Sequence, residues 1–384
     1  MKLNTNFDGL DSSVALCLKC GMCTYSAWPD CYPLCPIYQR HRVYTASAGG
    51  LVYLVRAIAE RKTGYTSTMA QLAYECPLCE ACDVCQVIPV PPPHVSPTEI
   101  VRFLRHQLVK QHMIPERTGQ VYHQLQKDPN YKERKTGLRL PERVKDDNAN
   151  TVLFVDGVHT EGERRIYESA IRLLEKAGKT IALFDEGESG YDLYDLGFWD
   201  ELSELVRSRS RQIEKLYGKE TLFINPHCQE FVTRRYPEIE PEHQQVRGRH
   251  FTEFLANVLK EGKLKVKREL SVKVSYHDPC RLSRGLGIHK APREVLSFLG
   301  VELVEMRRHG ENTYCCGASG GSSAFSDFLN WVAEERFREF RETGAELLLT
   351  ACPWCKEAFQ AVLPAEEREK VKDLIEFVDE VIAV

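Results

Sequence analysis

Hydrophobic and polar positions follow a repeating pattern from residue 151 to residue 382. Short apolar runs of the kind that form buried parallel strands alternate with longer amphipathic segments. The apolar runs lie at 152–155, 180–184, 222–225, 272–276, 301–306 and 346–349. The predicted helices lie before residue 177 and at 202–217, 251–259, 292–299, 325–342 and 371–382. This alternation predicts α/β units built on parallel sheets.

The order of strands and helices runs through this part of the chain twice. The first pass covers residues 151–262 and the second covers residues 263–384. Such a repeated order is typical of an internal duplication. We therefore predict two consecutive α/β repeats.

The N-terminal part of the chain has a different pattern. Apolar residues recur at helical spacing within 49–62, where Val52, Val55 and Ile58 share a face, and within 97–113. A proline-rich connector at 89–93 separates the two segments. We predict a helical domain over residues 1–125 and a polar linker over residues 126–150.

This N-terminal domain contains two C-x2-C-x2-C triplets, each followed by a trailing cysteine. The pattern is typical of a two-cluster ferredoxin module, in which each trailing cysteine serves the other cluster. The predicted ligands are Cys17, Cys20, Cys23 and Cys85 for one [4Fe-4S] cubane, and Cys76, Cys79, Cys82 and Cys35 for the other.

Two alternatives stay open for these cysteines. Cys31 could replace Cys35 as a ligand, although Pro36 after Cys35 favours Cys35. Pairs spaced C-x2-C also hold structural zinc, but a zinc ribbon needs two pairs per metal rather than two triplets. We therefore favour iron–sulfur clusters at both triplets.

Five further cysteines form one pattern near the end of the chain. Cys280 is followed after 34 residues by Cys315 and Cys316, and after 35 more by Cys352 and Cys355. Each group directly follows a predicted strand, so the thiols should meet at one edge of a sheet. Soft sulfur ligands suit iron or zinc. A disulfide set is a poorer interpretation, because five is an odd number and adjacent cysteines rarely bridge without strain.

The segments around these cysteines resemble the cysteine-rich CCG domain of heterodisulfide-reductase-like iron–sulfur oxidoreductases. The resemblance rests on YHDPC at 276–280, YCCGASGG at 314–321 and TACPWC at 350–355. It implies that Cys280, Cys315, Cys316, Cys352 and Cys355 hold a non-cubane [4Fe-4S] cluster. It also implies the fold class, which is a multi-domain α+β protein with a helical ferredoxin-like domain followed by a duplicated parallel α/β domain.

Other residues near the five cysteines are candidates for a role at this cluster. His277 could hydrogen-bond a cluster sulfur or relay a proton, and Gly317 should let the backbone turn around the cysteine pair. A nearby basic group could form a patch for an acidic partner or an anionic substrate, although solvated charges are the default expectation. This group contains Arg281, Arg284, Lys290, Arg293, Arg307 and Arg308.

The first repeat lacks this five-cysteine signature. Only Cys228, the counterpart of Cys355, remains there, next to His227. Many members of the family carry two complete signatures, so we expect the first repeat to be a scaffold without a cluster. Cys228 and His227 are then expected to be structural remnants.

Composition limits the class of protein. The chain has 384 residues, of which 43% are hydrophobic and 28% charged, as in an ordinary globular protein. A net charge of −4 argues against nucleic-acid binding. Without an apolar run long enough for a membrane span or a signal peptide, we expect a cytoplasmic protein, attached to a membrane only through a partner.

We therefore predict an iron–sulfur electron-transfer subunit of an oxidoreductase complex. A G-x-G-x-x-G fingerprint is absent from the sequence, so a flavoprotein partner should supply hydride chemistry. In the family, such subunits serve heterodisulfide reductases, several hydroxyacid oxidases, and complexes of anaerobic metabolism. The alternative is a catalytic subunit that reduces a disulfide at the five-cysteine cluster, and a third interpretation is a zinc-bearing interaction scaffold.

Overall fold

The fold is described from a computed structural model of the chain. The structure describes residues 14, 17–26, 31–83, 96–127, 137–156, 158, 160–242, 244–267, 270–318 and 326–383. Cys85, the predicted connector at 89–93, part of the predicted linker and residues 319–321 lie outside the described residues.

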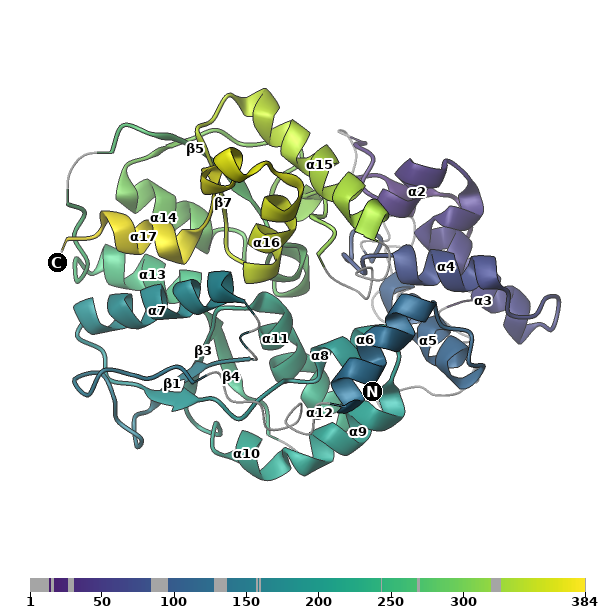
Figure 1. The fold of residues 1–384 in the computed structure, drawn as a ribbon, viewed down its shortest axis with the longest axis horizontal. Helices are drawn as coiled ribbons and strands as arrows, with labels where there is room; N and C mark the ends of the chain where they lie inside the picture. Colours follow the sequence, from purple (N-terminus) through teal and green to yellow (C-terminus); the bar gives the residue numbers. More distant parts are fainter. Residues whose placement is uncertain are drawn as a thin grey trace.

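Two four-stranded parallel sheets form the larger part of the molecule (Figure 1). The strands of the first sheet are β1 (Thr151–Phe154), β2 (Ala182–Phe184), β3 (Glu220–Phe223) and β4 (Arg247–His250), in the order β2-β1-β3-β4. Those of the second are β5 (Lys273–His277), β6 (Glu302–Leu303), β7 (Leu347–Thr350) and β8 (Val371–Asp373), in the order β6-β5-β7-β8. The two sheets therefore share one topology.

Helices connect the strands in both α/β units. In the first unit they are α7 (Glu161–Lys176), α8 (Tyr191–Leu196), α9 (Trp199–Ser208), α10 (Ser210–Glu214), α11 (Pro226–Glu230), η4 (Phe231–Arg235), α12 (Tyr236–Ile239) and α13 (Phe251–Lys260). In the second they are η5 (Arg281–Gly285), α14 (Ala291–Leu299), η6 (Gly310–Asn312), α15 (Ser326–Thr343), α16 (Pro353–Val362), η8 (Ala365–Lys370) and α17 (Leu374–Val381).

The alternation of side chains along the strands explains how the layers pack. Leu153 and Leu222 of the first sheet share a core with Val274 and Leu349 of the second, and helices α7, α13, α14 and α17 fill the space between. Phe154 and its neighbours on the other face pack toward the N-terminal helices. Each sheet is thus buried on both faces, which is why its strands are apolar runs.

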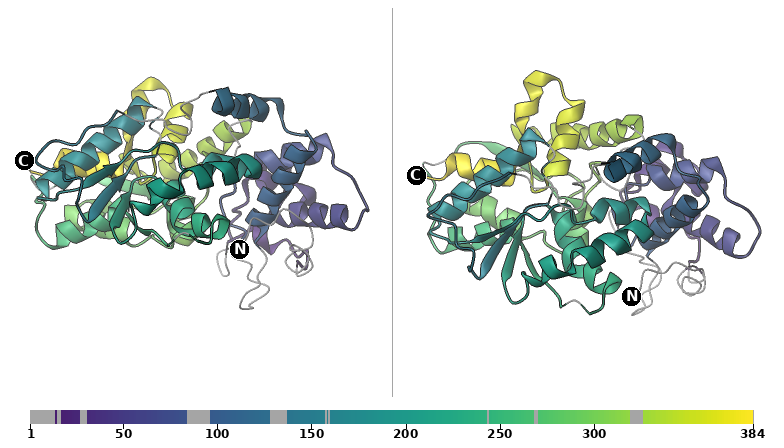
Figure 2. Two further views of the ribbon diagram at one scale, coloured as in Figure 1. Left: turned by 90° about the horizontal axis from the view of Figure 1, so that it is seen from below. Right: turned by 60° about the horizontal axis from the view of Figure 1, so that its bottom comes forward.

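The N-terminal part is helical and lies at one end of the molecule in all three views (Figures 1 and 2). Its elements are η2 (Met22–Thr24), α2 (Pro36–His41), η3 (Tyr44–Ala46), α3 (Ala48–Ala59), α4 (Ser67–Glu75), α5 (Pro97–Lys110) and α6 (Glu116–Lys127). Helix α5 carries the contact with the first α/β unit. Arg102 of α5 donates to Asp195 of α8 at 2.7 Å, and His106 stacks on Trp199 at 4.6 Å.

The apolar runs and the helical periodicities predicted most of these elements, often to within one or two residues. Three predictions need correction. The helix expected at 202–217 is broken at Arg209 into α9 and α10, the strand expected at 301–306 contains only two residues, and the helix expected from residue 371 begins at Leu374 after strand β8. Strand β4 and helices α2, α4, α6, α8, α11, α12 and α16 were not predicted.

The described part of the chain is therefore a helical region followed by two parallel-sheet α/β units, as the α+β fold class required. Among the described helices, none combines the length and apolar character that crossing a membrane requires.

Candidate metal centre

The five cysteines of the C-terminal signature lie together at the carboxyl edge of the second sheet. Cys280 follows β5, Cys352 caps the start of α16 after β7, and Cys355 lies in the first turn of that helix. Cys315 and Cys316 come from the segment between η6 and α15. All five side chains are at most 3% exposed. The topology thus gathers thiols that are up to 75 positions apart in sequence into one buried group.

These thiols contact one another directly. Cys316 Sγ donates to Cys355 Sγ at 3.1 Å, and the thiol of Cys315 lies near enough to those of Cys280 and Cys316 for both to raise its pKa. Every cysteine that the structure describes is a free thiol. The cysteines are therefore close enough to share one bound group.

Gly317 shapes the loop that presents the adjacent pair. Its φ of +84° is a left-handed conformation that favours glycine, and its N–H donates to Cys315 Sγ at 3.2 Å. A Cβ atom at this position would lie 3.2 Å from side-chain atoms of both Leu329 and Val332. The glycine is therefore required by both the turn and the packing of α15 against it.

The electrostatics of this group fit a bound metal. Burial raises the pKa of Cys352 and of Cys355, because thiolates are poorly solvated away from water. Interactions with neighbouring thiols lower the pKa of Cys316, and the contact with Cys315 contributes most to this shift. A bound metal ion would stabilise this buried set of sulfur donors as thiolates, and soft sulfur suits iron.

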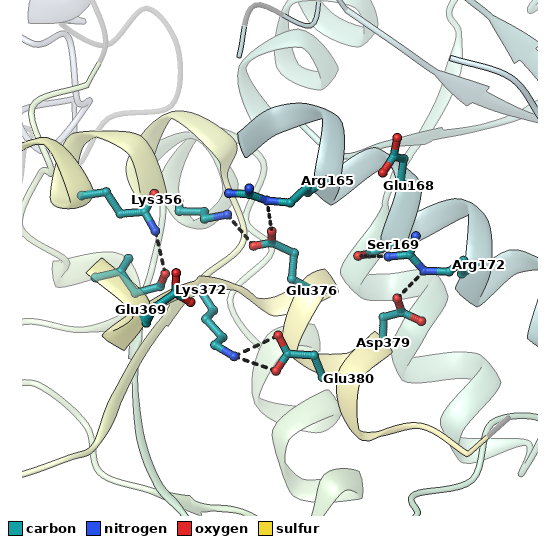
Figure 3. Close-up of a pocket in the computed structure, with 12 residues that line it drawn as sticks. Arg165, Glu168, Ser169, Arg172, Lys356, Glu369, Lys372, Glu376, Asp379 and Glu380 are labelled. Atoms are coloured by element: carbon teal, nitrogen blue, oxygen red, sulfur yellow. Dashed lines mark hydrogen bonds and ion pairs between the residues drawn. The ribbon is translucent and has the colours of Figure 1, made fainter. Parts of the chain in front are cut away.

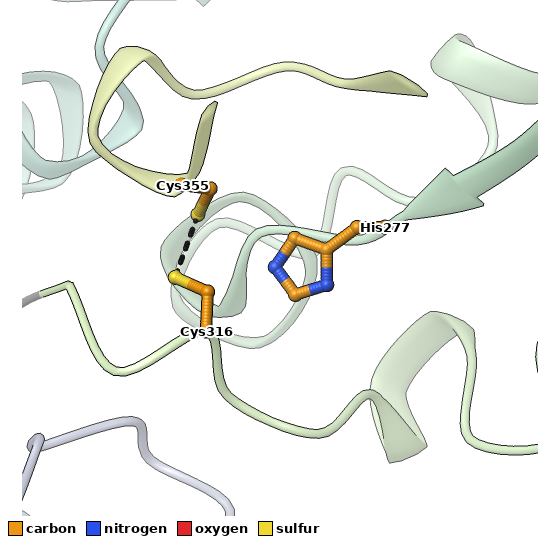
Figure 4. A group of neighbouring side chains, drawn as sticks. All are labelled: His277, Cys316 and Cys355. Carbon is orange, nitrogen blue, oxygen red and sulfur yellow. Dashed lines mark hydrogen bonds between the residues drawn. The ribbon is translucent and has the colours of Figure 1, made fainter. Parts of the chain in front are cut away.

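His277, the last residue of β5, lies beside two of these thiols. One of its ring nitrogens and the sulfurs of Cys316 and Cys355 lie within 4.8 Å of one another (Figure 4). Arg336 Nε of helix α15 donates to His277 Nδ1 at 3.1 Å. Burial lowers the pKa of His277, and the neighbouring Cys316 opposes this shift. The sequence offered no signal for Arg336, which is 59 positions away.

A second group of cysteines lies in the N-terminal helical part. Cys76 directly follows the last residue of α4, Cys79 and Cys82 lie in the loop after it, and Cys35 caps the start of α2. Burial raises the pKa of Cys35, and the nearby Cys76 and Cys79 raise it further. Cys35 therefore lies among the second triplet, as the predicted ligand set requires. Burial, followed by the carboxylate of Asp83, raises the pKa of Cys82.

The first triplet is closer to the surface. Cys20 is exposed, whereas Cys17 and Cys23 are half-buried. Burial raises the pKa of Cys23 to about 11, and Cys17 and Cys20 lie near enough to add to the shift. These three cysteines are thus also neighbours, while their predicted fourth partner, Cys85, lies outside the described residues. Cys31, the alternative to Cys35, is half-buried.

The two triplet loops share an unusual backbone conformation. Lys19 and Gly21, on either side of Cys20, have φ values of +57° and +78°. Leu78 and Glu80, on either side of Cys79, have φ values of +48° and +61°. Left-handed conformations at non-glycine residues cost about 1–3 kcal/mol each and cluster at functional sites. Both loops therefore wrap in the same way around their central cysteine.

The second triplet and the five-cysteine group meet. The thiols of Cys79 and Cys315 are neighbours, and their interaction is the main reason that the pKa of Cys79 is lowered to about 6. The two residues are far apart in sequence, so this contact is a product of the tertiary fold. It leaves no protein layer between the two groups of thiols.

Arginines of the second α/β unit hold the N-terminal loops against it. Arg281 is ion-paired with Glu80, Arg284 Nε donates to Cys79 O at 2.9 Å, and Arg308 Nη1 donates to Pro33 O at 2.7 Å. Arg281 also lies 3.4 Å from Glu230. The expectation of a surface patch or of solvated charges is wrong for these three residues, because the fold turns them inward onto the cysteine loops.

Two other members of the predicted basic group also have internal partners. Arg293 is paired with Asp278 at 2.7 Å and with Glu305 at 2.7 Å. Arg307 is more than half exposed, and its guanidinium lies over the ring of Tyr32. The expectation of solvated charges therefore holds for Arg307 and for the exposed Lys290, but not for the arginines that face inward.

The carboxyl edge of the first sheet is filled by a polar cluster. Asp156 accepts hydrogen bonds from Ser189 Oγ at 3.0 Å, from the Ser189 N–H, and from the thiol of Cys228. His227 packs its ring on Trp354 at 4.6 Å, next to Cys355. Cys228 is therefore engaged by a carboxylate, and His227 contacts the neighbour of a candidate ligand rather than the thiol group itself.

A charged pocket lies between α7 of the first unit and α17 of the second (Figure 3). Its basic side chains are paired across the pocket. Lys356 lies 2.6 Å from Glu376, Arg172 lies 2.7 Å from Asp379, and Lys372 and Arg165 also face carboxylates. The pairs of Arg172 and Arg165 join the two units, and the four pairs together leave the described lining without an unpaired cation for an anionic ligand.

The chain is similar to known iron–sulfur proteins. Residues 274–360 match the cysteine-rich domain family, abbreviated CCG. The chain is 32% identical over 306 residues to a subunit of the dihydromethanophenazine:CoB–CoM heterodisulfide reductase of Methanosarcina mazei, in a match that covers 75% of this chain and 73% of that protein. It is 30% identical over 234 residues to the probable iron-sulfur-binding oxidoreductase FadF of Bacillus subtilis, covering 57% of this chain and 32% of that protein.

Several groups of neighbouring free thiols on a scaffold with parallel sheets are typical of an iron–sulfur protein. The length and identity of the match to the heterodisulfide reductase subunit define the class of protein more narrowly. The chain belongs to the family of heterodisulfide-reductase-like iron–sulfur oxidoreductases, and it is an oxidoreductase subunit.

Proposed function

We propose that this chain is the electron-transfer subunit of an oxidoreductase complex and holds two [4Fe-4S] cubanes and one non-cubane CCG cluster. The observation that carries the proposal is the contact between Cys79 and Cys315. It joins a candidate cubane ligand to a candidate ligand of the five-cysteine group. When bound, the clusters would supply one-electron transfer.

The proposed ligand sets follow the groups of neighbouring thiols. One cubane is assigned to Cys17, Cys20, Cys23 and Cys85, and the other to Cys35, Cys76, Cys79 and Cys82. The third cluster is assigned to Cys280, Cys315, Cys316, Cys352 and Cys355. The proximity of Cys35 to Cys76 and Cys79 favours Cys35 over Cys31, and the matching backbone of the two triplet loops favours two equivalent sites.

The protein's own residues hold these sites together. Arg281, Arg284 and Arg308 fix the loops of Glu80, Cys79 and Pro33 against the second α/β unit. Because Cys20 is exposed, the cluster assigned to the first triplet is the one that a partner protein could approach. A flavoprotein in the cytoplasm is the partner that we propose, because the sequence carries no dinucleotide fingerprint of its own.

The shared strand order supports a duplication, with repeats at 151–262 and 263–384 after a cluster domain at 1–125 and a linker at 126–150. In the first repeat, Asp156, Ser189 and Cys228 satisfy one another at the sheet edge. We propose that this repeat is a scaffold that binds no cluster.

The alternative function is direct reduction of a disulfide at the five-cysteine cluster. The names of relatives from Methanosarcina, which are heterodisulfide reductase subunits, favour it. The burial of all five thiols disfavours it, because a substrate needs access whereas an electron does not. Turnover of disulfides by the isolated chain with an artificial reductant would favour the alternative.

Metal analysis tests the proposed function. Anaerobically purified protein should contain about twelve iron atoms and a similar amount of sulfide per chain, which corresponds to three four-iron clusters. Cys316→Ser should lose or alter one EPR signal and abolish electron transfer to the acceptor, while the two cubane signals stay.

Cys228→Ser is the matched control, because Cys228 occupies the corresponding edge of the first sheet and serine can still donate to Asp156. It should leave iron content and EPR spectra unchanged. About eight iron atoms per chain, or zinc at the C-terminal cysteines, would refute the third cluster. Unchanged electron transfer in Cys316→Ser would refute its role.

A further inference from the structure

His277 is held by a donor that cannot act as an acceptor. Arg336 Nε lies 3.1 Å from His277 Nδ1, and both side chains are fully buried. A guanidinium group is always protonated in proteins and has no acceptor atom. Nδ1 must therefore present its lone pair to Arg336.

This contact fixes the position of the imidazole proton. A neutral imidazole carries one N–H, so when Nδ1 accepts, the hydrogen is on Nε2. Figure 4 shows Nε2, the ring nitrogen farther from the main chain, facing Cys316 and Cys355. Nε2 is buried and makes no hydrogen bond to any described residue, and the sulfurs of Cys316 and Cys355 lie within 4.8 Å as the candidate acceptors. A protonated nitrogen has no lone pair for a metal ion.

Arg336 is itself held in place. Its Nη1 donates to Glu339 at 2.6 Å and its Nη2 donates to Thr313 Oγ1 at 3.3 Å. Glu339 in turn accepts from the Arg308 N–H at 2.7 Å. Phe359 packs against the imidazole with its ring nearly perpendicular, at 5.0 Å between centroids. The imidazole is thus held by Arg336 on one side and by Phe359 on another, which keeps its other nitrogen turned away from the thiols.

We propose that Arg336 is a positioning residue that fixes His277 as the Nε2–H tautomer, so that His277 donates a hydrogen bond to the cluster ligand Cys316 and does not itself bind iron. The inference rests on the proposed function, in which Cys316 holds a cluster. Hydrogen bonds to cluster sulfurs stabilise the more electron-rich state and raise the reduction potential. The hydrogen-bonded series Arg336, His277 and Cys316 therefore makes the five-cysteine cluster a better electron acceptor.

The test uses the anaerobically purified full chain and a potentiometric titration followed by EPR. His277→Leu, which removes the N–H donor, should lower the potential of the five-cysteine cluster. We expect about a tenfold change in its oxidised-to-reduced ratio at a fixed potential, which is about 59 mV for one electron. His277→Gln keeps a donor and should retain most of the wild-type potential. Arg336→Met should lower the potential although the imidazole is still present.

Phe359→Leu is the control, because it loosens packing on His277 without removing the donor. It should leave the potential unchanged. An equal shift in Phe359→Leu and His277→Leu, or no shift in the histidine and arginine variants, would overturn the inference.

A second readout needs only the wild-type protein. In the paramagnetic state of the five-cysteine cluster, pulsed EPR should detect an exchangeable proton and only weak nitrogen coupling. Strong coupling from a directly bound nitrogen, or the lack of the exchangeable proton, would overturn the inference even if the variants fail to fold. Iron analysis of the same samples separates the two proposals, because a protein without the third cluster refutes the proposed function instead.

Discussion

At the scale of single residues, contacts between distant positions decide the chemistry of the cysteine groups. The cysteine spacing indicated which thiols could be ligands, although only Cys280 and Cys352 closely follow strands, whereas Cys315 and Cys316 come after η6. It could not indicate Arg336 or the contact of Cys79 with Cys315, because both depend on how separate elements pack. For the same reason, the arginines near Cys280 were interpreted as a surface group, although Arg281 and Arg308 are buried.

Gly317 allows a prediction at this scale. Gly317→Ala should destabilise the protein by about 1–3 kcal/mol, because alanine is strained at a positive φ and its Cβ would crowd Leu329 and Val332 at 3.2 Å. It should also reduce the iron content through loss of the five-cysteine cluster. Apparent Tm and iron analysis check both effects.

Gly300→Ala is the matched control for this prediction. Gly300 also has a left-handed φ, of +71°, but a Cβ there would meet open space. It should lower the apparent Tm less and leave the iron content unchanged. Equal effects of the two substitutions would show that crowding at Gly317 is unimportant.

At the scale of elements, the apolar runs predicted strands well where both faces are buried and poorly elsewhere. Strand β4 has the sequence Arg-Gly-Arg-His and lies at the edge of its sheet, so it carries no apolar pattern. Strand β8 is three residues long and leads directly into α17, which concealed it within a helical pattern. Helix caps explain where both following helices begin, since His250 and Asp373 each form a capping box with a glutamate three residues later.

The His250 cap predicts a pH dependence of stability. Its Nδ1 accepts a hydrogen bond from the Thr252 N–H at an N···N distance of 3.3 Å, and its Nε2 lies 3.0 Å from Ile224 O. Burial lowers its pKa to about 4, below the value of about 6.5 in an unfolded chain. As pH falls below 6.5, the unfolded state takes up the proton first, so stability is lost until pH reaches the folded pKa. Between pH 7.5 and 5, the loss from this residue should be about 2 kcal/mol.

His250→Asn keeps a capping side chain but does not titrate, so its stability should fall less over the same range. Unfolding followed at several pH values, in both proteins and under anaerobic conditions, checks the difference. Parallel pH profiles would exclude His250 as the titrating group.

At the scale of the whole molecule, buried charges join the three structural parts. Arg281 of the second unit pairs with Glu80 of the N-terminal part and lies 3.4 Å from Glu230 and 3.7 Å from Asp195 of the first unit. One cation thus faces carboxylates from both other parts. A buried pair of this kind contributes little by itself, but removal of one partner leaves uncompensated charge.

Arg281→Met should therefore destabilise the protein strongly, by about 3–5 kcal/mol. Glu80→Gln added to Arg281→Met should restore part of the loss, because it removes one of the unpaired carboxylates. Apparent Tm values of the single and double variants give the coupling.

Arg338→Met is the control, since Arg338 is exposed and its pair with Glu335 should contribute less than about 1 kcal/mol. If Arg281→Met were as mild as Arg338→Met, Arg281 would not be a link between the parts.

The contact between Cys79 and Cys315 also governs how the protein is made. The five thiols are buried between the second sheet and the N-terminal loops, and the arginine contacts close that space once the parts have met. Iron and sulfide for the proposed five-cysteine cluster would therefore have to be delivered while the chain is still open. Cluster insertion would then have to precede the docking of the N-terminal part onto the second α/β unit. A chain that docks before its cluster is inserted would have to undock before iron could reach the five thiols.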